Sequence, residues 1–213
     1  MKERQLVYLV RHGQTAWAMA MRHTGRTDIP LTDDGRREAA VLRPVFQDIA
    51  FDLVLSSPLQ RAFETCRIAG LADRARTTAD LMEWDYGDYE GKTTVEIRKH
   101  VPDWTVFTHP CPGGETIGQM AARADRVIAE IRQVDGPVAV FAHGHLLRVL
   151  GARWLGLEPD HGRYLALGTG TLSVLGFDRG NTIIQAWNGP LLTAACALSH
   201  IAQESDINKE TAP

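Results

Sequence analysis

The fold is decided by the stretch Leu6-Val7-Tyr8-Leu9-Val10, which runs without a break into Arg11-His12-Gly13. Consecutive apolar residues, with β-branched and aromatic ones among them, are typical of a strand covered on both faces. Residues 52–55 and 138–142 have the same character. These runs predict a central sheet whose strands are buried on both sides.

Helical patterns lie between these strands. They cover residues 33–48, 59–71 and 117–134, and a further helix is expected between His145 and Gly156. Thr32 precedes two acidic residues, which is typical of a helix N-terminus. Strands that alternate with helices predict an α/β fold, here a three-layer α/β/α sandwich on a mostly parallel sheet.

After residue 163 the pattern changes. Residues 171–177 and 182–187 predict two strands, and Asp178-Arg179-Gly180-Asn181 predicts a hairpin turn between them. We therefore expect an antiparallel pair at one edge of the sheet. Without internal repeats, the chain is expected to form a single domain over residues 1–203, followed by a flexible polar tail over 204–213.

Residues 84–116 show little periodicity and contain several Trp, Gly and Pro. Such a segment is a candidate for a mobile cover over a site. Its aromatic residues would form either a lid or, as is commoner, part of the core. They are Trp84, Tyr86, Trp104 and Phe107.

Composition narrows the class of protein. The 213 residues include 23 basic and 26 acidic side chains, with a net charge of -3 and no block of like charge. A nucleic-acid binder normally has a basic excess, so no nucleic acid is expected as a partner. No segment reaches the roughly 20 apolar residues of a membrane helix, and the first apolar run is too short for a signal peptide. Three widely spaced cysteines are typical of reduced thiols, and we expect a cytoplasmic protein with no membrane partner.

Histidines follow two of the predicted strands. His12-Gly13 and His143-Gly144 both come after apolar runs, and ligands of open α/β sheets bind beyond the carboxyl ends of strands. The glycines let a ligand approach the backbone, and helix N-termini attract anions. We therefore expect both imidazoles at one anion-binding crevice. His143-x-His145 also suggests a metal site, but no third ligand has a suitable spacing, so neither a metal nor another cofactor is expected.

Two other segments carry charges suited to this crevice. Arg61 follows Ser56-Ser57-Pro58 and falls in the first turn of a predicted helix, where a guanidinium can bind a phosphate bidentately. Residues 83–91 alternate acids with aromatics around two glycines. A carboxylic acid partly enclosed by Trp and Tyr can stay protonated and act as a general acid.

Together these segments describe one reaction. Two arginines and His143 would neutralise a phosphoryl group, and His12 as a neutral imidazole would attack phosphorus to form phosphohistidine. A carboxylic acid would protonate the leaving alkoxide and afterwards deprotonate water. No Mg²⁺ would be required, because cationic side chains would neutralise the charge of the phosphoryl group.

These motifs resemble the histidine phosphatase superfamily, in its phosphoglycerate-mutase-like branch. They stand in the family's order from residue 6 to about residue 155. The matching stretches are residues 9–15, 24–28, 31–32, 56–62, 83–91, 113–116 and 143–144.

Carried over by position, the resemblance assigns roles to single residues. It implies that His12 is the phospho-acceptor, that Glu83 is the proton donor, and that Arg11, Arg61 and His143 form the phosphate pocket. Further residues are implied to line the phosphate and substrate site, namely Gly13, Gln14, Thr15, Thr24, Gly25, Gly144 and His145. Where mutases of the family usually have Asn after Trp17, this chain has Ala18, so a polar substrate contact is expected to be lost.

The resemblance leaves two activities to weigh. Cofactor-dependent phosphoglycerate mutases carry a long insertion between the acid and the second histidine, with a paired arginine for the substrate carboxylate. Glu83 and His143 are too close in this sequence for that insertion, and no adjacent Arg-Arg pair lies between them. Water should then reach the phosphohistidine. A metal-independent phosphomonoesterase is the expected activity, and a mutase is the alternative.

Within the phosphatases, the motifs resemble both bacterial acid phosphatases and sugar-bisphosphatases. Five basic residues could hold a second phosphate, although a solvated surface is their commoner place; they are Arg22, His23, Arg26, Lys92 and Arg98. A small phosphorylated metabolite is the expected partner and a homodimer the expected assembly. A phosphoprotein phosphatase stays open, and so does a non-catalytic phosphate-ester sensor, against which the presence of both His12 and Glu83 argues.

Overall fold

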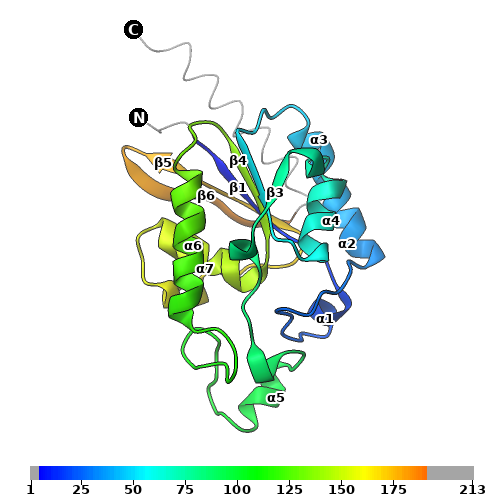
Figure 1. Cartoon of the computed structure of the whole chain (residues 1–213), viewed down its shortest axis with the longest axis vertical. Helices are drawn as coiled ribbons and strands as arrows, with labels where there is room; N and C mark the ends of the chain where they lie inside the picture. Colours follow the sequence, from blue (N-terminus) through cyan, green and yellow to red (C-terminus); the bar gives the residue numbers. More distant parts are fainter. Residues whose placement is uncertain (1–4, 191–213) are drawn as a thin grey trace.

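The computed structural model describes residues 5–190, and its centre is one sheet of six strands (Figure 1). The strands are β1 (Val7–Arg11), β2 (Leu53–Ser56), β3 (Ala75–Thr77), β4 (Val138–Ala142), β5 (Thr171–Asp178) and β6 (Asn181–Pro190). Their order in the sheet is β3-β2-β4-β1-β5-β6. The first four in this order are parallel, whereas β5 pairs antiparallel with β1 and β6. The predicted mostly parallel sheet with an antiparallel edge is confirmed.

Helices cover both faces of this sheet (Figure 1). They are α1 (Ala16–Met19), α2 (Asp33–Ala40), α3 (Leu42–Phe46), α4 (Gln60–Ile68), α5 (Thr94–Arg98), α6 (Ile117–Ile131) and α7 (Gly144–Trp154). Short 3₁₀ turns are η1 (Ala72–Arg74), η2 (Ala79–Leu81), η3 (Gly87–Tyr89) and η4 (Pro159–Tyr164). α6 and α7 lie on one face and α2, α3 and α4 on the other, while α1 and α5 lie beyond the end of the sheet at which β1 ends.

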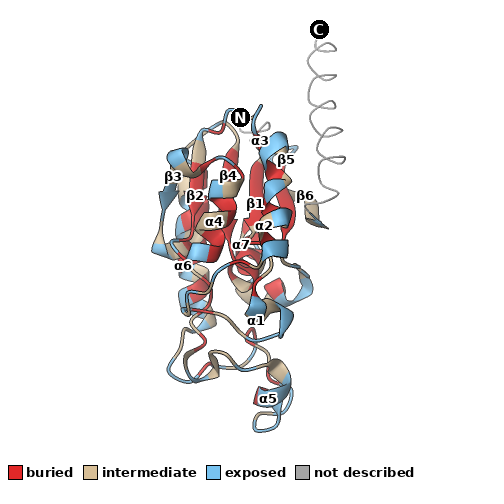
Figure 2. Cartoon of the chain, turned by 90° about the vertical axis from the view of Figure 1, so that its right-hand side faces the viewer, coloured by how far each residue is buried: buried red, intermediate tan, exposed pale blue. Residues whose placement is uncertain are grey.

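The side chains of β1 alternate between the two faces. Val7 and Leu9 pack in a core cluster with residues of α6 and α7, whereas Tyr8 and Val10 pack with residues of α3 and α4. β4 alternates in the same way, and both strands lie in the buried centre of the molecule (Figure 2). A strand buried on both faces needs a continuous apolar run, which is why the sequence pattern located it.

The register of the parallel strands positions the polar residues that follow them. Arg11 pairs with Ala142, and Ser56 pairs with Phe141. The chain therefore leaves β1, β4 and β2 at the same edge with His12, His143 and Ser57 as the next residues. Backbone hydrogen bonds hold two of these exits, from His12 N to Ala142 O at 3.1 Å and from Ser57 N to Phe141 O at 2.9 Å.

The helix predicted over residues 33–48 is two helices, with a break at Val41. In a continuous helix Pro44 would be an interior residue without an N–H for the hydrogen-bond ladder. The break places Pro44 in the first turn of α3, where that N–H is not needed. The predicted N-cap is confirmed, since Thr32 Oγ1 accepts a hydrogen bond from Gly35 N at 3.1 Å.

The hairpin and the aromatic residues follow their predictions. Arg179 and Gly180 both have positive φ, 49° and 81°, as a two-residue turn between antiparallel strands requires. The four aromatic residues named for residues 84–116 are part of the core, with exposed fractions of 1 to 5%; they are Trp84, Tyr86, Trp104 and Phe107. Within residues 5–190, no helix is long and apolar enough to cross a membrane. The predicted tail over 204–213 lies outside the described residues, as do residues 191–203.

Candidate active site

The edge where β1 and β4 end borders a pocket of about 480 Å³. This is where ligands of open α/β sheets are expected. Ala18, at the position where a polar contact was expected to be lost, is part of its wall. The wall is made by Arg11, His12, Thr15, Ala18, Arg22, His23, Thr24, Glu83, Tyr86, Gly144, His145, Arg148 and Leu167.

His12 is a buried, neutral imidazole at this wall. Its Nδ1 lies 2.7 Å from the carbonyl oxygen of Gly13. Because a carbonyl can only accept, Nδ1 carries the proton and Nε2 keeps its lone pair. Burial lowers the pKa of His12 well below 6.5, and the nearby cations of Arg61 and Arg11 lower it further. His12 is therefore neutral at neutral pH, with the lone pair of Nε2 available.

Arg11 lies against the first residue of α7. A Cβ atom on Gly144 would come within 3.1 Å of Arg11 Cζ and 3.2 Å of its Nε. A side chain at this position would push the guanidinium aside by a few tenths of an ångström. The Arg11 guanidinium also donates to the carbonyl oxygen of Leu167, which fixes it at the pocket wall.

Arg61 is the second residue of α4 and is fully buried, not a surface arginine. Its terminal nitrogens donate to three backbone carbonyls, at 3.1 Å to Thr24, 3.0 Å to Gly25 and 3.0 Å to Thr27. The guanidinium therefore holds the 24–27 loop against the site. It acts on His12 from behind the pocket wall, since it is not among the residues that line the pocket.

His143 lies beside His12, with ring centroids 5.1 Å apart and ring planes at 60°. Its Nε2 is 2.8 Å from Ser57 Oγ, which also accepts a hydrogen bond from Leu59 N. Where the Ser57 hydroxyl donates to His143 Nε2, the proton of the neutral ring lies on Nδ1. Burial lowers the pKa of His143 well below 6.5, with Arg61 adding to the effect.

Three of these side chains keep a buried polar atom without a partner. Within residues 5–190, four buried side-chain polar atoms make no hydrogen bond. Three of the four are Arg11 Nε, Arg61 Nε and His143 Nδ1. Buried polar groups are normally paired, so these unpaired atoms close to His12 favour an anion-binding site in their vicinity.

Glu83 approaches the same pocket from the loop after η2. Its carboxylate is 5% exposed and accepts hydrogen bonds from Trp84 N, His145 N and Leu146 N at 2.9, 2.9 and 3.0 Å. Two of these donors lie in the first turn of α7, where backbone N–H groups have no partner within the helix. Glu83 therefore lies where α7 begins, next to the residue that follows His143.

The other predicted substrate residues divide into two groups. Thr15, Thr24, Gly144 and His145 line the pocket, whereas Gly13, Gln14 and Gly25 do not. These three are held by other contacts: Gly13 packs on the backbone of Gly35, Gln14 Oε1 accepts from Thr32 Oγ1 at 2.9 Å, and Gly25 N donates to Glu90 at 2.8 Å.

His145 contacts two residues that were not predicted to be catalytic, Tyr86 and His23. Its Nδ1 is 2.5 Å from the hydroxyl of Tyr86, whose pKa burial raises well above 10. Tyr86 therefore stays protonated, and its hydroxyl can donate to Nδ1. The ring of His23 lies 4.8 Å from that of Tyr86, and burial lowers the pKa of His23 to about 4. Burial likewise lowers the pKa of His145.

Arg148 was missed at the level of sequence. It lies one helical turn after Gly144 on α7, so the helix period could have placed it on the same face as the site. Its Nε donates to Gly162 O at 3.0 Å, and its guanidinium lies 4.6 Å from the ring centre of Phe107. Leu167 was missed too, because it reaches the pocket from a loop before β5 that no local pattern connects to the site.

A second pocket of about 510 Å³ adjoins the first through His23, His145 and Arg148. Arg98 and Arg163 also line it, and no carboxylate is among its lining residues. Of the basic residues proposed for a second phosphate, Arg22 and His23 thus line the first pocket, and His23 and Arg98 the second. Arg26 instead faces Asp85 at 3.5 Å, and Lys92 lies over the ring of Tyr89.

Comparison with known families places this geometry in context. The model of the histidine phosphatase superfamily (branch 1) matches residues 7–190. An acid phosphatase of Mycobacterium tuberculosis is 40% identical over 176 residues, which cover 81% of this chain and 86% of the relative. The sedoheptulose 1,7-bisphosphatase of Saccharomyces cerevisiae is 37% identical over 183 residues, 70% of this chain and 67% of the relative.

A solved structure shares the fold. The product of the open reading frame Rv3214 from Mycobacterium tuberculosis aligns with a TM-score of 0.83 at 37% identity. The alignment covers 88% of this chain and 98% of the other.

Proposed function

This chain belongs to the histidine phosphatase superfamily, branch 1, and on that premise we propose that it hydrolyses phosphate monoesters through a phosphohistidine formed on His12. The proposal is carried by the free buried donors of Arg11, Arg61 and His143 beside a neutral His12. A phosphoryl group presents oxygens that such donors bind strongly, because donor and acceptor are both charged or polarised.

In the proposed first step, His12 Nε2 attacks phosphorus and the bond from phosphorus to the ester oxygen breaks. Arg11 at the pocket wall stabilises the charge on the phosphoryl oxygens during transfer, and Arg61 behind the wall and His143 beside His12 add to the favourable electrostatic environment. Glu83 gives its proton to the departing alkoxide, which leaves as the alcohol. In the second step, Glu83 takes a proton from water, the water oxygen attacks phosphorus, and phosphate departs as the bond to His12 breaks.

The expected substrate is a small phosphate ester. The wall of the first pocket is made largely of side chains that converge from several elements, as in the site of a small metabolite. A phosphoprotein substrate would instead need an open mouth that admits an extended chain.

A second candidate function, the hydrolysis of sugar bisphosphates, is favoured by one observation. The adjoining pocket has Arg98, Arg148 and Arg163 in its wall and no carboxylate. A substrate with its reacting phosphate at His12 could place a distal anion there. The name of the yeast relative, a sedoheptulose 1,7-bisphosphatase, agrees with this candidate.

The proposal is tested by trapping the intermediate. Enzyme mixed with ³²P-labelled phosphate ester and quenched in alkali within milliseconds should carry label that is stable to base and labile to acid, as phosphohistidine is. The H12A variant, folded by circular dichroism, should carry none and should not release phosphate from an aryl phosphate. Turnover retained in H12A would refute the proposal.

A parallel assay decides between phosphatase and mutase. A panel of phosphate esters is incubated with a chelator present, and 2- and 3-phosphoglycerate interconversion is followed with a bisphosphoglycerate primer added. Phosphate release without isomerisation supports the phosphatase. Isomerisation faster than hydrolysis would establish the mutase alternative and would show that water does not reach phospho-His12.

A further inference from the structure

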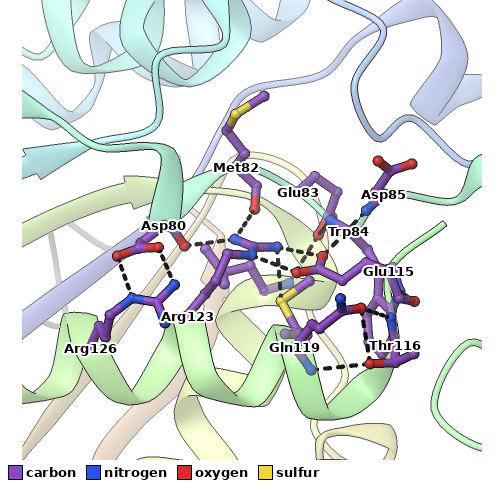
Figure 3. Close-up of polar contacts among 12 residues, drawn as sticks. Asp80, Met82, Glu83, Trp84, Asp85, Glu115, Thr116, Gln119, Arg123 and Arg126 are labelled. Carbon is purple, nitrogen blue, oxygen red and sulfur yellow. Dashed lines mark hydrogen bonds and ion pairs between the residues drawn. The ribbon is translucent and has the colours of Figure 1, made fainter.

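Arg123 in α6 is a buried arginine outside the pocket, and all of its donors are engaged (Figure 3). Its Nε and one terminal nitrogen bind the two carboxylate oxygens of Glu115, each at 2.7 Å. Its other terminal nitrogen donates to two backbone carbonyls, of Asp80 at 2.7 Å and of Met82 at 2.9 Å. One guanidinium thus joins Glu115 to the segment that leads into Glu83.

Glu115 holds the chain on the other side of Glu83. Its carbonyl oxygen accepts from Trp84 Nε1 at 2.8 Å, and its N–H donates to the carbonyl of Asp85 at 2.9 Å. Arg123 therefore binds the residue before Glu83, and its partner Glu115 binds the two residues after it. Figure 3 shows these contacts gathered on one side of the 80–85 segment, above α6.

The Glu83 carboxylate is engaged elsewhere, with the backbone N–H groups that begin α7. Its backbone is thus held from α6 while its side chain reaches α7. A general acid must come within about 3 Å of the oxygen it protonates. A displacement of about 1 Å in such a geometry can cost about 100-fold in rate.

We propose that Arg123, fixed by Glu115, is the positioning residue that sets the reach of Glu83 toward the leaving-group oxygen. The inference rests on the proposed role of Glu83 as proton donor. A buried ion pair is weak evidence for a role in stability, since apolar residues can often replace it at no cost. Two backbone carbonyls on one nitrogen of Arg123, by contrast, define the path of the chain to Glu83.

The leaving group separates a positioning role from a merely structural one. An aryl phosphate such as p-nitrophenyl phosphate leaves as a stable phenolate and needs little help from an acid. An alkyl phosphate such as glycerol 3-phosphate leaves as an alkoxide and needs a proton in the transition state. A general loss of folding or of phosphate binding lowers kcat/KM for both substrates by the same factor.

The experiment compares kcat/KM for these two esters in E83Q, R123M, E115Q and a control, R153M. Arg153 makes a similar bidentate pair with Asp125 of α6 but does not touch residues 80–85. E83Q should lose about 100-fold or more on the alkyl ester relative to the aryl ester. R123M should lose about tenfold in the same sense, and R153M should show no selective loss. E115Q keeps the shape of Glu115 but removes its charge, and it tests the same positioning role if R123M does not fold.

The outcomes are distinct. Selective loss in E83Q together with R123M or E115Q supports the inference. Selective loss in E83Q alone, with equal factors for both esters in R123M and E115Q, overturns the positioning role and leaves the proposed function intact. Equal factors in E83Q itself would refute its role as acid, and the inference with it, while labelling of His12 would still test the phosphatase separately.

Discussion

The rings of His12 and His143 lie 5.1 Å apart because Arg11 and Ala142 are paired residues of parallel strands. Two imidazolium ions could not share this place with two arginines without strong repulsion. The pKa of each histidine is accordingly held well below 6.5, mainly by burial and further by Arg61 and Arg11. In the proposed mechanism, one neutral ring acts as nucleophile while its neighbour donates a hydrogen bond to the phosphoryl group.

The first prediction concerns the titration of these rings. The ¹H–¹³C signals of His12 and His143 should not move between pH 7 and pH 5.5, whereas a histidine peptide in the same buffer titrates near its ordinary pKa of about 6.5. Assignment by H12A and H143A identifies the signals. A midpoint near 6.5 for His12 would contradict the neutral nucleophile.

Neutral buried histidines also predict how stability depends on pH. The pKa of His23 is lowered to about 4 by burial, so between pH 6.5 and 4 the unfolded chain binds a proton there that the folded protein does not. The stability from His23 is present above pH 6.5 and is lost as the pH falls toward 4, by about 3 kcal/mol at most. Urea unfolding across this range measures the loss.

A matched variant isolates that contribution. His23→Phe keeps a ring against Tyr86 and Trp104 and removes the titrating group. The fall in unfolding free energy between pH 6.5 and 4 should be smaller in this variant than in the parent. An identical slope in both proteins would show that His23 is protonated in the folded state.

Gly144→Ala should separate activity from stability. The added Cβ lies 3.1 Å from Arg11 Cζ, so the guanidinium must move by a few tenths of an ångström. We expect kcat/KM to fall about tenfold. Alanine is the better helix former by up to about 1 kcal/mol, so the melting temperature should not fall. Lower activity together with a large loss of stability would instead indicate a packing defect in α7.

Ser57→Ala should weaken phosphoryl binding through its effect on His143. It removes the partner 2.8 Å from His143 Nε2, and the tautomer of the ring is no longer fixed. We expect a loss of about 1 kcal/mol in unfolding free energy and a fall of about fivefold to tenfold in kcat/KM for an aryl phosphate. Isothermal titration with vanadate should show the same weakening. Unchanged vanadate affinity would mean that His143 does not contact the phosphoryl group.

The basic residues of the adjoining pocket predict that a variant there changes KM for a bisphosphate but not for a monophosphate. Arg98→Ala removes an exposed cation from that pocket and should raise KM for a sugar bisphosphate about tenfold, with KM for the matching monophosphate unchanged. Lys99→Ala removes an equal charge from an exposed neighbour that does not line the pocket and serves as control. Equal effects of the two variants would show that Arg98 acts only through its long-range charge and does not bind the distal phosphate.

Much of the fold follows from local pattern. The apolar runs located β1, β2 and β4 to within one residue, and the turn residues Asp178 to Asn181 located the hairpin. His12 and His143 were predicted to lie close together, because both follow parallel strands that end at one edge of the sheet. The break between α2 and α3 was not predicted. The apolar periodicity continues across it, whereas the missing N–H of Pro44 ends the first helix.

What the sequence determined by itself is therefore the chemistry at strand ends: two histidines, an arginine after each of two strands and an acid in an aromatic loop. Only the tertiary structure decided which donors face the pocket. It buried Arg61 behind the wall, brought Arg148 and Leu167 to the front, and joined Glu115 to Arg123 below Glu83. These contacts join residues far apart in the chain, and their partners depend on the register and packing of whole elements, which no local spacing records.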